Sequence, residues 1–244
     1  MKGTHLELTE DLATGRDRIT VLSYNLWHGR AQAELVGIVA DREPDVLCIQ
    51  EARASGIPKQ IGPLRLAATT PRNRLSVALY VRTSRFDIES AAAVRLSVSR
   101  HDRLVGGTDE RLVTARVRDV SAGRNLVVGS FHGTPFTDSN GFRRRQVDDA
   151  HRAMQDLGPG LPMVMAGDYN HPILLPMLRW HLRRQGISVA STPTSTFHKE
   201  GSVMRGKFDL ATTTGFDVVT AQTLPQQSSD HRPVLFTLQY SPRA

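Results

Sequence analysis

The sequence predicts an α/β fold, in which strands and helices alternate along one chain. Apolar, strand-like runs at 19–23 and 46–50 flank residues 33–42, whose apolar side chains recur at helical spacing. Two further pairs of strand-like runs lie between residues 75 and 130, and a helical stretch then leads to an apolar run at 161–165. Strand–helix–strand units interleaved with strand pairs favour mixed sheets that are covered by helices.

The first strand–helix–strand unit puts two polar side chains at strand ends. Its first strand runs into Asn25, Pro44 closes its helix, and its second strand delivers Glu51. Because consecutive strands of such a unit are usually neighbours, we expect Asn25 and Glu51 to lie side by side. A glutamate at a strand end is otherwise an ordinary solvated residue, so Glu51 alone decides nothing.

The central part of the chain is predicted to form antiparallel strand pairs. Residues 75–82 are expected to pair with 86–98, and residues 112–120 with 126–130. The last of these strands ends at His132, directly before a glycine turn. A histidine at this position serves either as a catalytic group or as an ordinary turn residue.

A helix is predicted over residues 142–157, with capping residues before it and Gly158-Pro159-Gly160 at its end. Its apolar stripe faces the core. We expect its other face, and the helix that follows the next strand, to expose their polar side chains to solvent. These residues are Arg143, Arg144, Arg145, Asp148, Asp149, His151, Arg152 and His181.

The turn after the apolar run at 161–165 gathers polar groups. Asp168 and Asn170 are two residues apart at the carboxyl end of a core strand, so their side chains point the same way and converge on one ligand. This arrangement suits a metal-bound water or a phosphate. Aspartate and asparagine are also common turn residues, so a purely structural turn is the alternative.

The C-terminal part contains a second pair of polar residues. After a predicted helix at 172–185, Asp209 lies inside a predicted strand, where a carboxylate is costly unless it is paired. His231 precedes the final strand, residues 234–239, and is the natural partner for Asp209.

Length and composition indicate one globular domain. The chain has 244 residues, 39% hydrophobic and 23% charged, which predicts a domain at 19–240 after a short tail at 1–18. No run approaches the roughly 20 apolar residues that span a bilayer, which excludes an integral membrane protein. The first residues do not resemble a secretory signal, so we expect a cytoplasmic monomer. A removed leader, secretion or delivery as a toxin stay open. The only cysteine, Cys48, lies in an apolar run and rules out an internal disulfide.

The chain is strongly basic. Its formal net charge is +7, its pI is near 10.2, and arginine greatly outnumbers lysine. Such a balance favours polyanionic partners such as nucleic acid or acidic lipid headgroups. A genome rich in arginine codons would produce the same composition, so charge supports a phosphate substrate without choosing one.

Six ordered segments resemble one known family. They are YNLWHG, IQEA, FHGTP, AGDYNHP, KFDLA and SSDHRP. Together they resemble the endonuclease/exonuclease/phosphatase superfamily, which includes pancreatic-type deoxyribonuclease, from about residue 19 to residue 238. The resemblance implies a four-layered α/β sandwich, two packed mixed β-sheets flanked by helices, with the site in the cleft at their top. Within the superfamily, the chain is most similar to the deoxyribonuclease I-like branch, including the nuclease subunit of cytolethal distending toxins.

The resemblance also implies roles for the polar residues. Glu51 and Asn25, with Asp230, would be the ligands of Mg²⁺ or Mn²⁺, and Arg53 would contact the DNA backbone. A second set would carry the catalysis: His132, Asp168, Asn170, Asp209 and His231. In that set the aspartate and asparagine of AGDYN orient or deprotonate the attacking water. The paired histidine binds the phosphate or shares the acid–base work, and the histidine of FHGTP stabilises the transition state or protonates the leaving oxygen.

Three departures from the family pattern remove no ligand. Tyr24 replaces a common tryptophan, Tyr169 replaces the usual phenylalanine, and FHGTP replaces the frequent THL. The expected function is divalent-metal-dependent hydrolysis of phosphodiester bonds in DNA by an endonuclease. The alternatives are a phospholipid-headgroup phosphodiesterase or phosphatase, similar to sphingomyelinases or phosphoinositide phosphatases, and a binding module that has lost catalysis.

Overall fold

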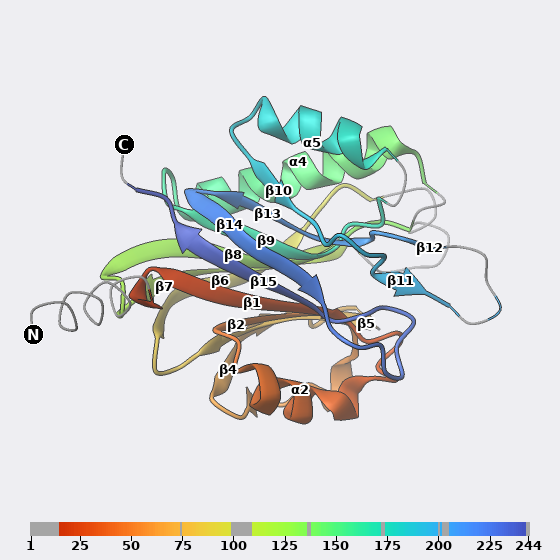
Figure 1. Ribbon diagram of the computed structural model, residues 1–244, viewed down its shortest axis with the longest axis horizontal. Helices are drawn as coiled ribbons and strands as arrows, with labels where there is room; N and C mark the ends of the chain where they lie inside the picture. The colour runs from red at the N-terminus through yellow and green to blue at the C-terminus, as the bar shows by residue number, and fades with distance from the viewer. Residues whose placement is uncertain are drawn as a thin grey trace, which may run out of the picture.

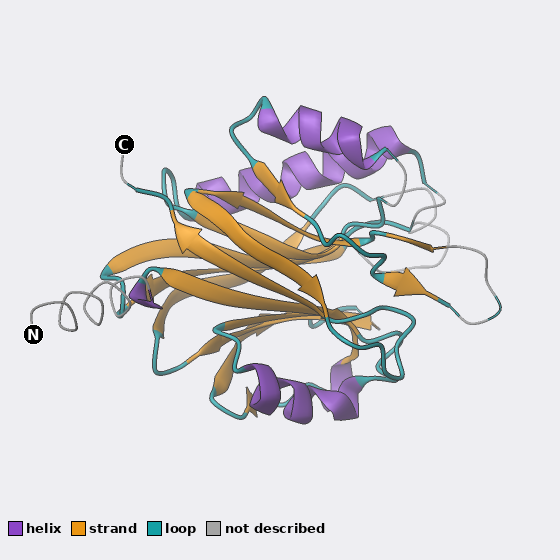
Figure 2. Ribbon diagram, viewed as in Figure 1, coloured by secondary structure: helices purple, strands orange, loops and turns teal. Residues whose placement is uncertain are grey.

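Two β-sheets pack face to face between two helical layers, as the computed structural model shows (Figure 1). The structure describes residues 15–73, 75–98, 109–135, 138–171, 174–199, 201 and 205–242. Figure 2 shows that the helices cover only the outer faces of the sheets. The predicted four-layered α/β sandwich is therefore confirmed.

One sheet has seven strands and holds both ends of the domain. Its strand order is β14 (Phe216–Thr223), β15 (Val234–Tyr240), β1 (Arg18–Asn25), β2 (Val46–Arg53), β5 (Leu75–Arg82), β4 (Leu64–Thr69) and β3 (Gln60–Ile61). Its outer face is covered by η1 (Gln32–Glu34) and α2 (Leu35–Arg42), while η2 (Ala54–Gly56) follows β2. The β1–β2 pair is parallel, as the sequence predicted.

The other sheet has six strands. Its order is β10 (Ser188–Ala190), β13 (Asp209–Thr214), β9 (Met163–Asp168), β8 (Arg124–His132), β7 (Glu110–Asp119) and β6 (Phe86–Arg95). Helices α4 (Asn140–Leu157) and α5 (Leu175–Arg183) cover its outer face (Figure 1). A small separate ribbon consists of β11 (Phe197–His198) and β12 (Arg205–Gly206).

Alternate residues of the central strands are buried on opposite sides. In β1, Val21 packs into the core between the sheets, whereas Leu22 packs against α2. In β8, Val128 faces the same central core and Val127 packs beneath α4. Because both faces of each central strand are buried, these strands appear in the sequence as continuous apolar runs.

The topology brings the polar strand ends together. The parallel pair β1–β2 places Asn25 opposite Gln50, and the parallel pair β8–β9 places His132 opposite Asp168. These two pairs pack on each other across the central core. Parallel strands end at the same edge, so their carboxyl-terminal side chains meet at one end of the sandwich.

One predicted strand pairing is wrong. Strands β5 and β6 do not pair, because the turn between them carries the chain from one sheet to the other. Arg85 in this turn is buried and binds Asp45, which precedes β2, and Asp119 of β7, both at 3.1 Å. Apolar alternation predicted both strands correctly but contains no information about which strand is the partner. The second predicted pair, β7 with β8, is confirmed.

The charged face of α4 is partly buried, contrary to expectation. Arg143 is 5% exposed and donates to the backbone carbonyls of Asp138 and Pro135. His151 is 4% exposed, and its Nε2 lies 2.9 Å from Thr212 Oγ1. Long or amphipathic side chains on a helix can reach inward to polar partners, which a simple apolar stripe does not reveal.

The chain ends and membrane expectations complete the fold. Residues 1–14 of the predicted tail lie outside the described residues, and Arg18 already belongs to β1. The division into a tail at 1–18 and a domain at 19–240 stays a prediction. Helix α5 begins at Leu175, whereas Pro172 lies outside the described part. Among the described residues, no helix is long and apolar enough to cross a membrane.

Candidate active site

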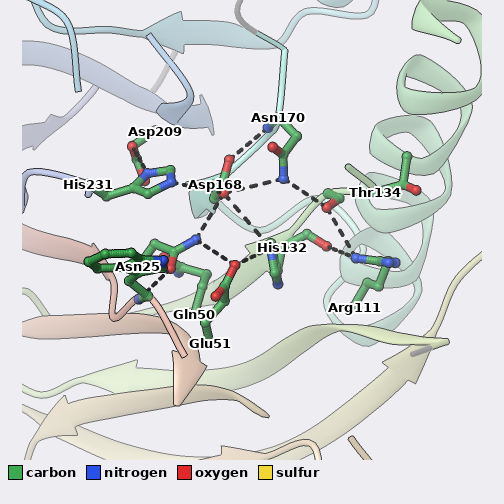
Figure 3. A network of polar contacts seen from close by, with 12 residues as sticks. Asn25, Gln50, Glu51, Arg111, His132, Thr134, Asp168, Asn170, Asp209 and His231 are labelled. Atoms are coloured by element: carbon green, nitrogen blue, oxygen red, sulfur yellow. Dashed lines mark hydrogen bonds and ion pairs between the residues drawn. The ribbon is translucent and has the colours of Figure 1, made fainter. Parts of the chain in front are cut away.

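Side chains from the ends of both sheets converge at one edge of the sandwich (Figure 3). Asn25 and Glu51 come from β1 and β2 of the seven-stranded sheet. His132 and Asp168 come from β8 and β9 of the other sheet, where the register also places Asp209 of β13 opposite Asp168. The cluster therefore joins strand ends that are far apart in the sequence.

Asp168 lies at the centre of the cluster and is 2% exposed. Its Oδ1 accepts a hydrogen bond from the backbone amide of Asn170 at 2.8 Å. Its Oδ2 accepts from the side-chain amides of Asn25 at 3.0 Å and Asn170 at 3.3 Å. Asn170 is held in turn by the carbonyl oxygen of Gly133 at 3.2 Å. These bonds fix the carboxylate in one orientation.

Glycine is required immediately before this aspartate. A Cβ atom at Gly167 would lie 1.8 Å from the carbonyl oxygen of Phe131 on β8. The close approach lets β9 pair tightly with β8, and it places Asp168 opposite His132. The glycine of the AGDYN segment is therefore needed for the geometry of the site.

Backbone strain is concentrated around the same cluster. Glu51 has a φ of 54° at a register shift in β2, and Asn170 has a φ of 48°. Trp27 and His28, in the loop after Asn25, have φ values of 45° and 57°. Non-glycine residues seldom adopt this left-handed conformation, and such residues cluster at functional sites. The irregularity in β2 directs Glu51 towards Asn25, since a bulge re-aims a side chain.

Glu51 is an anion in this environment. Its Oε1 accepts from Asn25 Nδ2 at 3.4 Å, and its Oε2 accepts from the backbone amide of His28 at 3.0 Å. Burial raises its pKa, but His132 and His28 outweigh burial and lower the pKa below the ordinary value. His132 Nε2 lies 3.7 Å from Glu51 Oε1 and 3.8 Å from Asp168 Oδ2.

His231 and Asp209 form a buried pair. His231 Nδ1 lies 2.8 Å from Asp209 Oδ2, so the partnership expected from the sequence is present. The rings of Phe197 and Phe208 pack against the imidazole with centroids 5.0 and 6.0 Å away. The other ring nitrogen, Nε2, lies 3.8 Å from Asp168 Oδ2. Asp209 thus fixes which edge of the imidazole faces the centre of the site.

The two histidines have opposite charge states near neutral pH. Burial opposes the charged form of His231, but Asp209 and Asp168 raise its pKa to about 10. Burial lowers the pKa of His132 to about 4, although Glu51 opposes this change. Burial also raises the pKa of Asp168 to about 7, with His231 opposing and Asp209 reinforcing the rise. The site therefore combines a cation, a neutral imidazole and a carboxyl that titrates near neutrality.

Two predicted site residues lie at the margin of this network. Asp230 is half-buried, and its pKa is raised by burial and further by the nearby charge of Glu51, while His231 opposes the rise. Arg53 is exposed, and its Nε donates to the carbonyl oxygen of His28 at 3.2 Å. The structure thus places seven of the nine predicted residues in one contact network: Asn25, Glu51, His132, Asp168, Asn170, Asp209 and His231.

Sequence reasoning missed three residues that support the site. Ser229 Oγ donates to the carbonyl oxygen of Asn25 at 2.7 Å and accepts from the amide of His231 at 3.1 Å. Glu34 accepts from Tyr24 Oη at 2.7 Å and from the amide of Ser228 at 2.9 Å. Arg111 is buried and donates to the carbonyl oxygen of His132 at 3.2 Å. Only Ser229, which lies within SSDHRP, carried a signal in the sequence.

The donor set fits a hard divalent cation that takes few protein ligands. The described residues contain no group of three or more histidine, cysteine or acidic side chains arranged to hold a metal by themselves. Mg²⁺ is commonly bound by one or two carboxylates together with waters and substrate phosphates. The ionised Glu51 supplies one such carboxylate. Asn25 Oδ1 accepts from the amide of Trp27 at 3.0 Å and retains a second lone pair.

Comparison with known proteins identifies the family. Residues 22–231 match the model of the Endonuclease/Exonuclease/phosphatase family. The chain belongs to this family. Its members are phosphoester hydrolases that generally use divalent metals, so the chain is a phosphoesterase of this kind. A comparison with curated proteins gave no match.

Solved structures of the endonuclease/exonuclease/phosphatase fold superpose on the chain. The human Nocturnin catalytic domain with bound sulfate has a TM-score of 0.73 at 17% identity, covering 92% of this chain and 94% of that one. D. rerio TDP2 with a single strand DNA product has a TM-score of 0.71 at 15% identity, covering 91% and 99%. A Bacteroides thetaiotaomicron mannosyl-6-phosphatase has a TM-score of 0.69 at 16% identity, covering 91% and 100%. At these identities the likeness shows the fold.

Proposed function

We propose that this phosphoesterase is an endonuclease that hydrolyses phosphodiester bonds of DNA with the help of Mg²⁺ or Mn²⁺. The observation that carries the proposal is the buried carboxyl of Asp168, placed between the cationic His231 and the neutral His132. An anionic phosphodiester needs a positive charge for its oxygens and a base for the attacking water. The cluster supplies both within one network.

Asp168 is the proposed general base. A base is most effective when its pKa lies near the working pH, and burial raises the pKa of Asp168 to about 7. The Asn170 amides hold the carboxylate, which leaves its orientation fixed when water binds. A positioned base of this type contributes about 10² to 10⁴ in rate.

His231 is proposed to bind a phosphoryl oxygen as an imidazolium. Asp209 holds Nδ1, so the N–H at Nε2 is free to donate towards the centre of the site. His132 is neutral near pH 7 and is proposed to stabilise the leaving oxygen by a hydrogen bond. A bound divalent cation would be held by Glu51 with Asn25 and Asp230, and would neutralise negative charge on the phosphoryl oxygens.

DNA is the proposed substrate because of charge at the mouth of the site. The chain carries a formal net charge of +7, and Arg53 lies exposed beside the loop that contacts Glu51. D. rerio TDP2, which has the same fold, was solved with a single strand DNA product. The mannosyl-6-phosphatase of the same fold makes small phosphate esters the main competing outcome.

The test is nicking of supercoiled plasmid DNA with Mg²⁺ or Mn²⁺ and with EDTA. We expect nicking with metal, none with EDTA, and a higher metal requirement in Glu51→Gln. The control is Glu89→Gln, since Glu89 is an acidic residue remote from the site that pairs with Arg116 at 2.7 Å. An intact plasmid under both metals, with release of phosphate from sugar phosphates, would contradict the proposed DNA substrate.

A further inference from the structure

The loop after β1 is fixed to the site by its backbone. The amide of Trp27 donates to Asn25 Oδ1 at 3.0 Å, and the amide of His28 donates to Glu51 Oε2 at 3.0 Å. Arg53 Nε then donates to the carbonyl oxygen of His28 at 3.2 Å. Residues of this loop therefore keep a defined position at the mouth of the site.

Two cations lie near the ring of Trp27. The guanidinium of Arg30 lies 3.8 Å from the centroid of the ring, and Lys199 Nζ, from the β11–β12 ribbon, lies 6.0 Å from it. An aromatic face attracts a cation within about 6 Å, by roughly 0.5–1 kcal/mol at an exposed site. The ring thus orders positive charge from two segments that are distant in the sequence.

These cations have no acidic partner. Arg30, Arg53 and Lys199 are exposed, and none of them forms an ion pair with a described carboxylate. Other arginines of the chain are neutralised: Arg85 pairs with Asp119 and Arg116 pairs with Glu89. We call Arg30, Arg53 and Lys199 the rim cations, because they surround the loop that contacts Glu51.

We infer that the rim cations bind the phosphates that flank the scissile bond, so that the enzyme favours a nucleic-acid strand over an isolated phosphate ester. This inference rests on the proposed nuclease function and deepens it. A guanidinium stacked on an aromatic ring keeps its N–H edge free, and that edge matches two phosphate oxygens. A small phosphate ester has no flanking phosphate and cannot use these contacts.

A simpler role for the rim cations makes a different prediction. The site contains Glu51, Asp168, Asp209 and Asp230, and nearby cations could merely offset their negative charge. Removing the rim cations would then slow hydrolysis of DNA and of a small diester by the same factor. Binding of flanking phosphates predicts a loss that is confined mainly to DNA and depends on salt.

The test compares a duplex oligonucleotide with bis(p-nitrophenyl) phosphate for the wild type and the double variant Arg30→Ala/Lys199→Ala. The matched control is Arg184→Ala, because Arg184 also stacks on a tryptophan, 4.7 Å from the ring centroid of Trp180 on α5. Each lost phosphate contact reduces the slope of log affinity against log salt by about 0.9. Between about 50 and 200 mM salt, two lost contacts should therefore reduce the salt sensitivity of DNA kcat/KM about tenfold.

Binding of a labelled duplex in EDTA gives a second readout that needs no turnover. We expect the double variant to bind more weakly and with a smaller salt slope, and Arg184→Ala to match the wild type. If the wild type cuts DNA but the double variant keeps the same salt slope and the same ratio of DNA to small-diester kcat/KM, the rim inference is overturned alone. If the wild type hydrolyses only the small diester, the proposed function is overturned and the inference with it.

Discussion

Replacement of His151 by glutamine should remove a large part of the acid sensitivity of the fold. His151 lies on the inner face of α4, and its Nε2 is 2.9 Å from Thr212 Oγ1. Thr212 Oγ1 lies 2.8 Å from Tyr169 Oη, and Tyr169 directly follows Asp168. This buried chain therefore supports the loop that carries the proposed base.

The magnitude follows from the burial of the imidazole. Burial lowers the pKa of His151 from 6.5 to about 4, although Asp148 opposes the change. Between these two values the unfolded chain binds a proton that the folded chain does not, so this stability is complete above about pH 6.5 and is lost as the pH falls towards 4. From pH 7 to pH 4.5, the contribution of His151 should fall by about 2.5 kcal/mol.

The assay is urea unfolding of the wild type and His151→Gln in EDTA at several pH values. Glutamine can still bond to Thr212 but does not titrate. We expect the free energy of unfolding of the wild type, relative to the variant, to drop by about 2.5 kcal/mol between pH 7 and pH 4.5. Curves that stay parallel within about 0.5 kcal/mol would refute the argument that His151 is held neutral by burial.

Three further substitutions test how the site is held together. Asp209→Asn should lower the pKa of His231 from about 10, as followed by NMR titration, and should lower kcat by about 10² or more, because the imidazolium loses its partner; an unchanged titration would exclude that pairing. Gly167→Ala should cost about 3 kcal/mol of stability because of its contact with Phe131, whereas Gly37→Ala, with open space around it in α2, should be neutral or stabilising in the same melting assay. Glu34→Ala should lower kcat about tenfold by releasing the loop that begins at Ser228, with partial recovery in Glu34→Gln, and equal rates in both variants would contradict this role.

The sequence could predict the site where covalent connection and burial leave few choices. A strand–helix–strand unit makes β1 and β2 neighbours, which brings Asn25 to Glu51. A carboxylate inside a strand needs a partner, which identified His231 for Asp209. The apolar runs indicated the central strands because both of their faces are buried.

Other features depend on long-range packing and left no pattern in the sequence. Strands β5 and β6 belong to different sheets, although both have an ordinary strand pattern. His151 is buried because Thr212, 61 residues further along the chain, offers it a partner. The left-handed conformation of Glu51 arises where β2 shifts its register against β5. Each of these features requires knowledge of neighbours that local periodicity does not contain.

The most direct test of the central claim is the rate of diester hydrolysis by Asp168→Asn with a divalent metal present. Asparagine keeps the size of the side chain and removes the base. The control is Asp148→Asn, since Asp148 lies on the outer side of α4 and bonds His181 at 2.9 Å. We predict that Asp168→Asn loses a factor of about 10³ in kcat, while Asp148→Asn stays within about twofold of the wild type. Equal rates for Asp168→Asn and the wild type would contradict the assignment of this cluster as the active site.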